Sequence, residues 1–299
     1  MTETLLTLRR ALAYALDDLG AYVLASGSTT TAVSNGLKNS ATNASVNRYD
    51  GRWVYVATGV QAGQQGRVKT GGYAPSTGTL TMVTTWGAPT TGDTIELTSL
   101  FPCAASSTTA PGEDVSYRTL INRALSRLLL PDDTITLQIT TSQTYSLAAY
   151  PWLDRDERLI EVREPGPTGG LDVPAAWRRP ALRTIGATAY VILDAPFGAG
   201  ATGNLTLIVK RTADTLINGA ESTVGLALDT DTAEATVDDV VTVGLLEAYR
   251  ALMARGSVAP AGAWSAKFAG QLAECRRLRY WDRSSEVTAP APEPVGATA

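Results

Sequence analysis

The stretch that most closely resembles a ligand-binding loop is GVQAGQQG, in which Gly59, Gly63 and Gly66 fall close together. Glycine-rich loops can cradle phosphates, because backbone N–H groups approach a ligand closely where no side chain intervenes. A phosphate loop requires G-x-x-x-x-G-K-[ST] before a helix, and a dinucleotide fingerprint requires G-x-G-x-x-G between a strand and a helix. Neither spacing is present, and RVKTGGY after Gly66 has the composition of a strand and a turn. We therefore expect turns here and no cofactor.

The chain of 299 residues contains no histidine. This removes the Ser-His-Asp and Cys-His nucleophile systems and the commonest general base. The carboxylate pairs Asp132–Asp133 and Asp238–Asp239 remain, but both are expected at helix ends, where carboxylates have ordinary structural roles. We predict no catalytic residues and a protein that is not an enzyme. A carboxylate-dependent glycosidase is the remaining enzymatic alternative.

The cysteines and the acidic residues form no metal-ligand pattern. Cys103 and Cys275 are far apart and neither belongs to a CxxC motif, so two unpaired, buried or half-buried thiols are expected. The acidic stretch DTDTAEATVDD lacks the central glycine and the terminal glutamate of a calcium-binding EF-hand loop. It is more typical of a solvated connector and helix entry, and no metal site is predicted.

A basic cluster, CRRLRYWDR, lies near the C-terminal end of the chain. Arg276, Arg279 and Arg283 recur at spacings of three and four, so they would line one face of a helix. This face either is solvated or contacts another subunit or the portal, or it faces the phosphates of nucleic acid. The neighbouring Tyr280 and Trp281 also suit a protein interface.

A second set of candidate partner contacts lies in the glycine-rich region. Trp53 and Tyr55 are two residues apart, so they would share one face of a strand. That arrangement suits an aromatic platform for a partner, and it suits the core of a sandwich equally well. Gln61, Gln64 and Gln65 are expected at an exposed loop tip, where they contact a partner or face water.

The elements that must position these side chains follow from the sequence periodicity. Leucines at spacings of three and four in residues 3 to 25 predict an amphipathic helix, with Arg9 and Arg10 largely off the apolar stripe. Short runs rich in Val, Tyr, Trp and Thr between glycine or proline turns predict antiparallel strands. The predicted domains, in chain order, are an N-terminal bundle helix (1–25), an inserted β domain (26–112), a bundle helix (113–131), a β-sandwich (132–212), an acidic connector (213–235), C-terminal helices (236–283) and a flexible tail (284–299).

The expected fold class is therefore α+β: a helical bundle with an inserted small antiparallel β-barrel or sandwich domain and a second β-sandwich domain. Hydrophobic residues make up 44% of the chain and charged residues 18%, as in globular proteins, and the net charge of −4 is not that of a polycation. The N-terminal residues MTETLLTLRRALAYALDD lack the pattern of a signal peptide, and no stretch reaches the ~18 apolar residues of a membrane span. We expect folding in a cytoplasm and no membrane partner.

The local texture and the order of elements resemble proteins of tailed-bacteriophage virions. The stretch GRWVYVATGVQAGQQGRVKTGGYAPSTGTLTMVTTWGAPTTGDTIELTSLFP resembles a β module of virion structural proteins. The stretches YRTLINRALSRLLLPDD, YSLAAYPWLDRDERLIEV, AYVILDAPFGAGATGNLTLIVKRT and DDVVTVGLLEAYRALMARG resemble head-to-tail adaptors of the connector or tail-tubular type. The β insertion departs from the minimal adaptor bundle.

This resemblance implies a virion structural protein of the neck, assembled in the cytoplasm of a bacterial host. Such adaptors form homo-oligomeric rings, usually of about twelve copies, between the portal and the tail or head-closure proteins. The ring would continue the channel through which double-stranded DNA passes without sequence-specific contacts. The alternative is a binding module associated with a phage tail, baseplate or fibre, which recognises a surface glycan or a receptor through aromatic residues of the β module.

Overall fold

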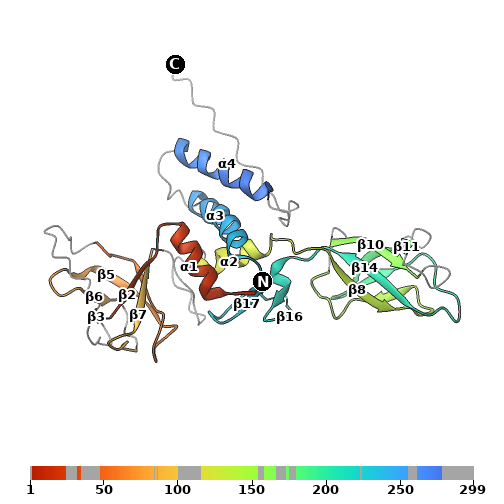
Figure 1. The fold of residues 1–299 in the computed structure, drawn as a ribbon, viewed down its shortest axis with the longest axis horizontal. Helices are drawn as coiled ribbons and strands as arrows, with labels where there is room; N and C mark the ends of the chain where they lie inside the picture. Colours follow the sequence, from red (N-terminus) through yellow and green to blue (C-terminus); the bar gives the residue numbers. More distant parts are fainter. Residues whose placement is uncertain are drawn as a thin grey trace, which may run out of the picture.

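The protein has a helical centre with one β domain on each side, as Figure 1 shows for the computed structural model. The structure describes residues 2–24, 32–34, 48–83, 85, 87–99, 116–153, 158–165, 173–174, 180–222, 224–254 and 261–277. These residues form seventeen strands, arranged in four sheets, and four α-helices. Three separate hydrophobic cores lie in the centre, in the first β domain and in the second β domain.

The helices occupy the centre and share their core with a small sheet. They are α1 (Leu5–Ala15), α2 (Tyr117–Leu125), α3 (Val237–Ala254) and α4 (Ala261–Arg277). The expected α+β fold built on a helical bundle is wrong, because sheet predominates among the described residues and no bundle core is present. Since α1 and α2 have only 11 and 9 residues, their apolar faces are too short for a bundle and pack on α3 and on sheet residues such as Ile217 and Ala233.

The region expected to be an acidic connector is folded into the central sheet. Its strands β15 (Leu216–Ile217), β16 (Ala220–Glu221) and β17 (Thr232–Glu234) join β1 (Thr2–Thr4) in the order β1-β17-β15-β16. The prediction of a connector over residues 213–235 is therefore wrong. Strands of two or three residues are too short to show a readable alternation, and they are stabilised by pairing with distant parts of the chain.

The N-terminal helix is shorter than the leucine spacing predicts. It begins after Thr4, whose side chain accepts a hydrogen bond from the Thr7 N–H group, and it ends at Ala15. Asp17 adopts a left-handed conformation with φ 55°, which a continuing helix cannot accommodate. The chain then enters strand β2 (Gly20–Val23) of the first β domain. The expected helix over 1–25 and the domain boundary at residue 26 are thus incorrect.

The first β domain is one six-stranded antiparallel sheet in the order β2-β7-β4-β5-β6-β3. Its core consists of side chains that alternate along the strands, such as Val54 and Val56. The remaining strands of this sheet are β3 (Ala32–Ser34), β4 (Trp53–Val56), β5 (Gln65–Ala74), β6 (Thr79–Met82) and β7 (Thr94–Thr98).

The second β domain consists of two antiparallel sheets around one core. One sheet has the order β11-β10-β14-β8 and the other the order β12-β13-β9. Apolar side chains from both sheets, such as Leu205 and Val191, are fully buried in this core. The strands are β8 (Asp133–Gln138), β9 (Thr144–Ser146), β10 (Leu159–Glu164), β11 (Val173–Pro174), β12 (Ala181–Ile185), β13 (Thr188–Ile192) and β14 (Asn204–Val209).

Helix α2 connects the two β domains through the centre. Its N-cap is Ser116, whose hydroxyl accepts a hydrogen bond from the Thr119 N–H group at 3.0 Å. On its outer side, the Asn122 amide donates to the Leu226 carbonyl at 3.0 Å and accepts from the Leu226 N–H group at 2.9 Å. The Asn122 amide thus makes two hydrogen bonds to the loop ahead of β17. Gly225 of this loop lies close against the Asn122 side chain.

We predict that Gly225→Ala destabilises the protein by about 1–3 kcal/mol, because the new methyl group would lie 2.6–2.9 Å from the side-chain atoms of Asn122 and displace them. Urea unfolding of the full chain measures the difference. Gly270→Ala is the matched control: this position in α4 has no neighbouring atom within 4 Å, so the change should stabilise by up to about 1 kcal/mol. Equal effects of the two substitutions would contradict the prediction.

Candidate functional site

The glycine-rich loop is a set of turns that its own glutamines hold in place. Gly59 and Gly63 have φ angles of 87° and 89°, as the predicted turn chemistry requires, so this prediction is confirmed. The amide of Gln64 donates to the Gln61 side chain at 2.5 Å and its oxygen accepts from the Gly87 N–H group at 2.7 Å. Gln61 and Gln64 are therefore engaged within the domain rather than presented at an exposed tip.

The expected aromatic pair is not an exposed platform. Tyr55 is only 4% exposed, while Trp53 is half-buried in the same strand. Gln65, opposite Tyr55 in strand β5, is also half-buried. The Tyr55 ring lies 4.2 Å from the guanidinium carbon of Arg9, and its hydroxyl donates a hydrogen bond to Asp229. Tyr55 is thus an internal contact between the first β domain and the centre, and its assignment as a partner contact is wrong.

Of the five residues proposed in the basic cluster, Arg276 is described. It is exposed in the last turn of α4. Arg279, Tyr280, Trp281 and Arg283 lie outside the described residues. That the set lines one helical face therefore stays a prediction.

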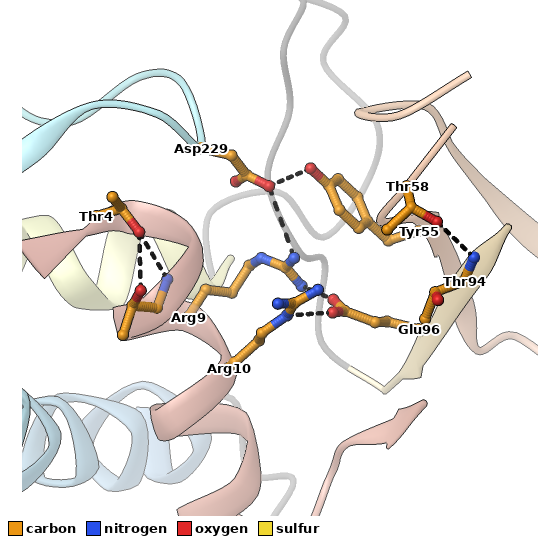
Figure 2. A network of polar contacts seen from close by, with 9 residues as sticks. Thr4, Arg9, Arg10, Tyr55, Thr58, Thr94, Glu96 and Asp229 are labelled. Atoms are coloured by element: carbon orange, nitrogen blue, oxygen red, sulfur yellow. Dashed lines mark hydrogen bonds and ion pairs between the residues drawn. The ribbon is translucent and has the colours of Figure 1, made fainter. Parts of the chain in front are cut away.

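The most elaborate cluster of charged groups lies between α1 and the first β domain (Figure 2). Arg9 is fully buried, and its Nη1 atom lies 2.6 Å from Oε2 of Glu96, which is 1% exposed. The second oxygen of Glu96 accepts a hydrogen bond from Arg10 at 2.5 Å. Nη2 of Arg9 lies 3.7 Å from Asp229, which also accepts the hydroxyl of Tyr55. We call these five residues the Arg9 cluster.

The Arg9 cluster joins three segments that are far apart in the sequence. Arg9 and Arg10 come from α1, Tyr55 and Glu96 from strands β4 and β7, and Asp229 from the loop before β17. A buried guanidinium requires compensating charge and hydrogen bonds, since leaving it without them costs several kcal/mol. The cluster therefore holds the β domain in one position on the helical centre.

Sequence reasoning placed Arg9 off the apolar stripe of α1, and the structure shows the opposite. One signal was available: Arg9 follows Leu5 by four residues and precedes Leu12 by three, so it belongs to the same helical face. A charged residue on an apolar face is informative because it must be paired when it is buried. The identity of its partners was not readable, since Glu96 is separated from Arg9 by most of the first β domain.

The loop that carries Asp229 is itself well ordered by hydrogen bonds. Asp231 accepts the N–H groups of Ala227 and Leu228, both at 2.8 Å, and the amide of Asn218 at 3.0 Å. Burial by itself would raise the pKa of Asp231, but these hydrogen bonds to the ionised form outweigh it and lower the pKa. Asp229 and Asp231, in the region predicted to be an acidic connector, therefore make contacts within the protein.

A second arginine joins the other β domain to the centre. Arg211 is 8% exposed; its Nη1 atom lies 2.7 Å from Asp133 at the start of β8, and its Nη2 atom pairs with Glu221 of β16. Its Nε donates to the Thr215 hydroxyl at 3.2 Å, and its guanidinium lies 4.9 Å from the centre of the Trp152 ring. We call these five residues the Arg211 cluster.

The remaining buried polar groups are suited to structure rather than to chemistry. The Tyr117 hydroxyl donates to Asp18 at 2.6 Å. Burial, reinforced by the Asp18 carboxylate, raises the pKa of Tyr117 far above its usual range, so this phenol stays protonated as a donor. Burial likewise raises the pKa of the Cys275 thiol to about 12. Cys275 is free and fully buried, and Cys103 lies outside the described residues.

No group of three or more potential metal ligands occurs within the part of the chain that the structure describes. In the same residues, no helix has the length and apolar character required to cross a membrane. No protein-family model matches the chain, and no curated protein matches it.

We predict that Arg9→Met lowers the free energy of unfolding by about 3–5 kcal/mol, because Glu96 then loses the one of its two cations that is fully buried with it. Arg10→Met is the matched control on the same carboxylate: Arg10 is 41% exposed, and its loss should cost about 1 kcal/mol or less. Denaturant unfolding followed by circular dichroism measures both values.

The double variant Arg9→Met/Glu96→Gln separates lost charge pairing from lost packing. It should be more stable than Arg9→Met alone, since the buried carboxylate that has lost Arg9 is then neutral as well. Equal losses for Arg9→Met and Arg10→Met would show that the Arg9 cluster does not hold the domain.

We predict that Cys275 resists alkylation in the native protein. With a thiol pKa of about 12, only about one thiol in ten thousand is ionised at pH 8, and burial also blocks access. Treatment with iodoacetamide followed by peptide mass spectrometry should recover Cys275 unmodified, whereas the denatured chain should be alkylated fully. Rapid modification of Cys275 in the native protein would contradict the burial seen here.

Proposed function

We propose that this protein is a structural component of the head-to-tail junction of a tailed bacteriophage, where copies form an adaptor ring between portal and tail. One support is the resemblance of its sequence stretches to virion β modules and to adaptor proteins. In the structure, the adaptor-like stretches supply α2, strands of the second β domain and α3, and these meet in and beside the centre. The proposal assigns no catalytic step to the chain.

The observation that carries the proposal is the arrangement of the helical centre and the two β domains. Two β domains extend from opposite sides of one helical centre, and buried arginine clusters join both to that centre. A chain held in this way can repeat around a ring with its β domains in a constant orientation, because the Arg9 and Arg211 clusters fix both domains on the centre. Heterologous contacts of this kind close into a ring when the rotation between copies permits.

Unpaired sheet edges provide one type of contact between copies. Among the described residues, β8 lies at an edge of its four-stranded sheet, and β12 and β9 are the edges of the three-stranded sheet. Such edges carry free backbone donors and acceptors, which a ring satisfies by symmetry. The partners in this proposal are further copies of the chain, the portal, tail or head-closure proteins, and double-stranded DNA that passes without sequence-specific contacts.

The alternative of a glycan- or receptor-binding β module is less well supported. It required Trp53, Tyr55, Tyr73 and Trp86 to form a stacking platform. Tyr73 is buried, and Tyr55 is buried against Arg9. The glutamines of the neighbouring loop are likewise bonded within the domain. We therefore retain the adaptor ring as the single proposed function.

We predict that the purified full chain forms closed rings of about twelve copies, either alone or when the portal protein of its phage is added. Mass photometry would give the number of copies, and negative-stain electron microscopy would show the ring. Antibody labelling of intact virions should place the protein at the neck. A chain that stays monomeric with the portal present and is missing from virions would exclude the proposal.

A further inference from the structure

The outer face of α2 carries positive charge. Arg118 and Arg123 line this face, and Asn122 and Ser126 follow Arg118 along it at spacings of four residues. Arg123 is exposed and Arg118 is half-buried, and the described residues that line the face include no carboxylate. We call this face, together with residues 224–227 of the loop beside it, the α2 surface.

A well-ordered loop places an exposed valine beside these arginines. Val224 is 69% exposed. Its N–H group donates to the Ser222 hydroxyl at 3.1 Å, and that hydroxyl donates to the Val224 carbonyl at 2.7 Å. The Asn122 side chain holds the same loop through its two hydrogen bonds to Leu226. The α2 surface therefore presents an apolar side chain next to two cations, and a partner need not order the loop in order to bind it.

A groove beside the start of α3 has the opposite charge. Leu129 and Leu130, which are half-buried, and Pro131, which is exposed, give it an accessible apolar lining. Glu234 and Asp239 also line it, and neither carboxylate is paired with a described lysine or arginine. We call it the α3 groove. It suits a partner that combines an apolar side chain with positive charge, which is what the α2 surface presents.

The α2 surface and the α3 groove share no residue, yet both belong to the helical centre. Leu226 of the α2 surface lies in the same hydrophobic core as Leu128 and Ala213, which line the α3 groove. Their separation is therefore fixed within one copy, so the α2 surface cannot close on the α3 groove of its own chain. A second copy supplies the complement of each. Contacts between two different surfaces of identical copies are heterologous, and they close into a ring when the rotation between copies permits.

We propose that the α2 surface of one copy docks in the α3 groove of the next copy. Val224 contacts the apolar lining of the groove. Arg118 and Arg123 face Glu234 and Asp239. Double-stranded DNA complements only the positive surface, because the carboxylates of the groove repel its phosphates, whereas a second copy complements both surfaces. This inference rests on the proposed function, since it names the contact that joins the copies of the proposed ring.

Charge reversal of one surface at a time tests the docking in the full chain. Arg118→Glu/Arg123→Glu makes both surfaces acidic, and Glu234→Arg/Asp239→Arg makes both basic. Each variant alone should stay monomeric where the wild-type chain forms rings, with the portal added to both if assembly needs it, because like charges then meet. An equimolar mixture should form rings in which the two variants alternate, because every contact again joins opposite charges. Mass photometry counts the copies, and native mass spectrometry gives the composition of the rings.

Matched variants separate the docking from a general effect of charge. Lys69→Glu and Asp194→Arg reverse exposed charges on the first and the second β domain, and both should form rings as the wild type does. Val224→Ala removes the apolar contact alone, and it should raise the protein concentration required for assembly about tenfold. Val224 is exposed in the single copy, so this variant should unfold at the same denaturant concentration as the wild type.

The outcomes distinguish this inference from the proposed function. Rings formed by either charge-reversed variant alone would overturn the docking and leave the adaptor ring standing. A mixture that stays monomeric while the wild type forms rings would do the same, and so would variants that lose binding to the portal or to DNA but keep their rings. A wild-type chain that forms no ring with the portal present would overturn both.

Discussion

A guanidinium group that is removed from water must find its compensating charges where it lies, and the arrangement of this protein depends on that constraint. Arg9 has no exposed surface, so Glu96 and Asp229 must stand beside it and the face of Tyr55 must cover it. These partners belong to the first β domain and to the loop before β17. Arg9 of α1 therefore ties both of them to the helical centre.

The same device recurs at the other contacts of the centre. Arg211 draws Asp133 of the second β domain and Glu221 of the central sheet to one point. Within the centre, Glu247 of α3 lies 3.1 Å from Arg127 and 2.8 Å from Arg250. Each core is apolar, whereas Arg9 and Arg211, both buried, pair with carboxylates from a neighbouring part of the fold. Such contacts are directional, because the N–H groups of a guanidinium donate to carboxylates in the plane of the guanidinium.

The difference between apolar cores and charged contacts is relevant to the proposed ring. Apolar contacts alone would permit the β domains to slide on the centre, since hydrophobic burial is non-directional. Directional pairs hold each domain at one angle, which a repeating ring requires of every copy.

The sequence by itself determined the local elements of this protein. Leucine spacing located α1, runs rich in Val, Tyr, Trp and Thr between turns located strands, and the glycines at 59 and 63 identified turns rather than a phosphate loop. Each of these signals acts over a few residues, so a short window of sequence contains it. The end of α1 at Ala15 and the short strands β15, β16 and β17 escaped this reading, since pairing with distant segments decides them.

Only the tertiary structure decided the partners of the charged residues and the role of the aromatic ones. Arg10 and Glu96 are 86 residues apart, and Tyr55 and Asp229 are 174 apart, and no local pattern specifies such pairs. The alternating sequence pattern around Tyr55 is the same whether its side chain faces a ligand or a buried arginine. Long-range packing resolves that choice, because the burial of one charge forces its partners to come from wherever the fold places a carboxylate within reach.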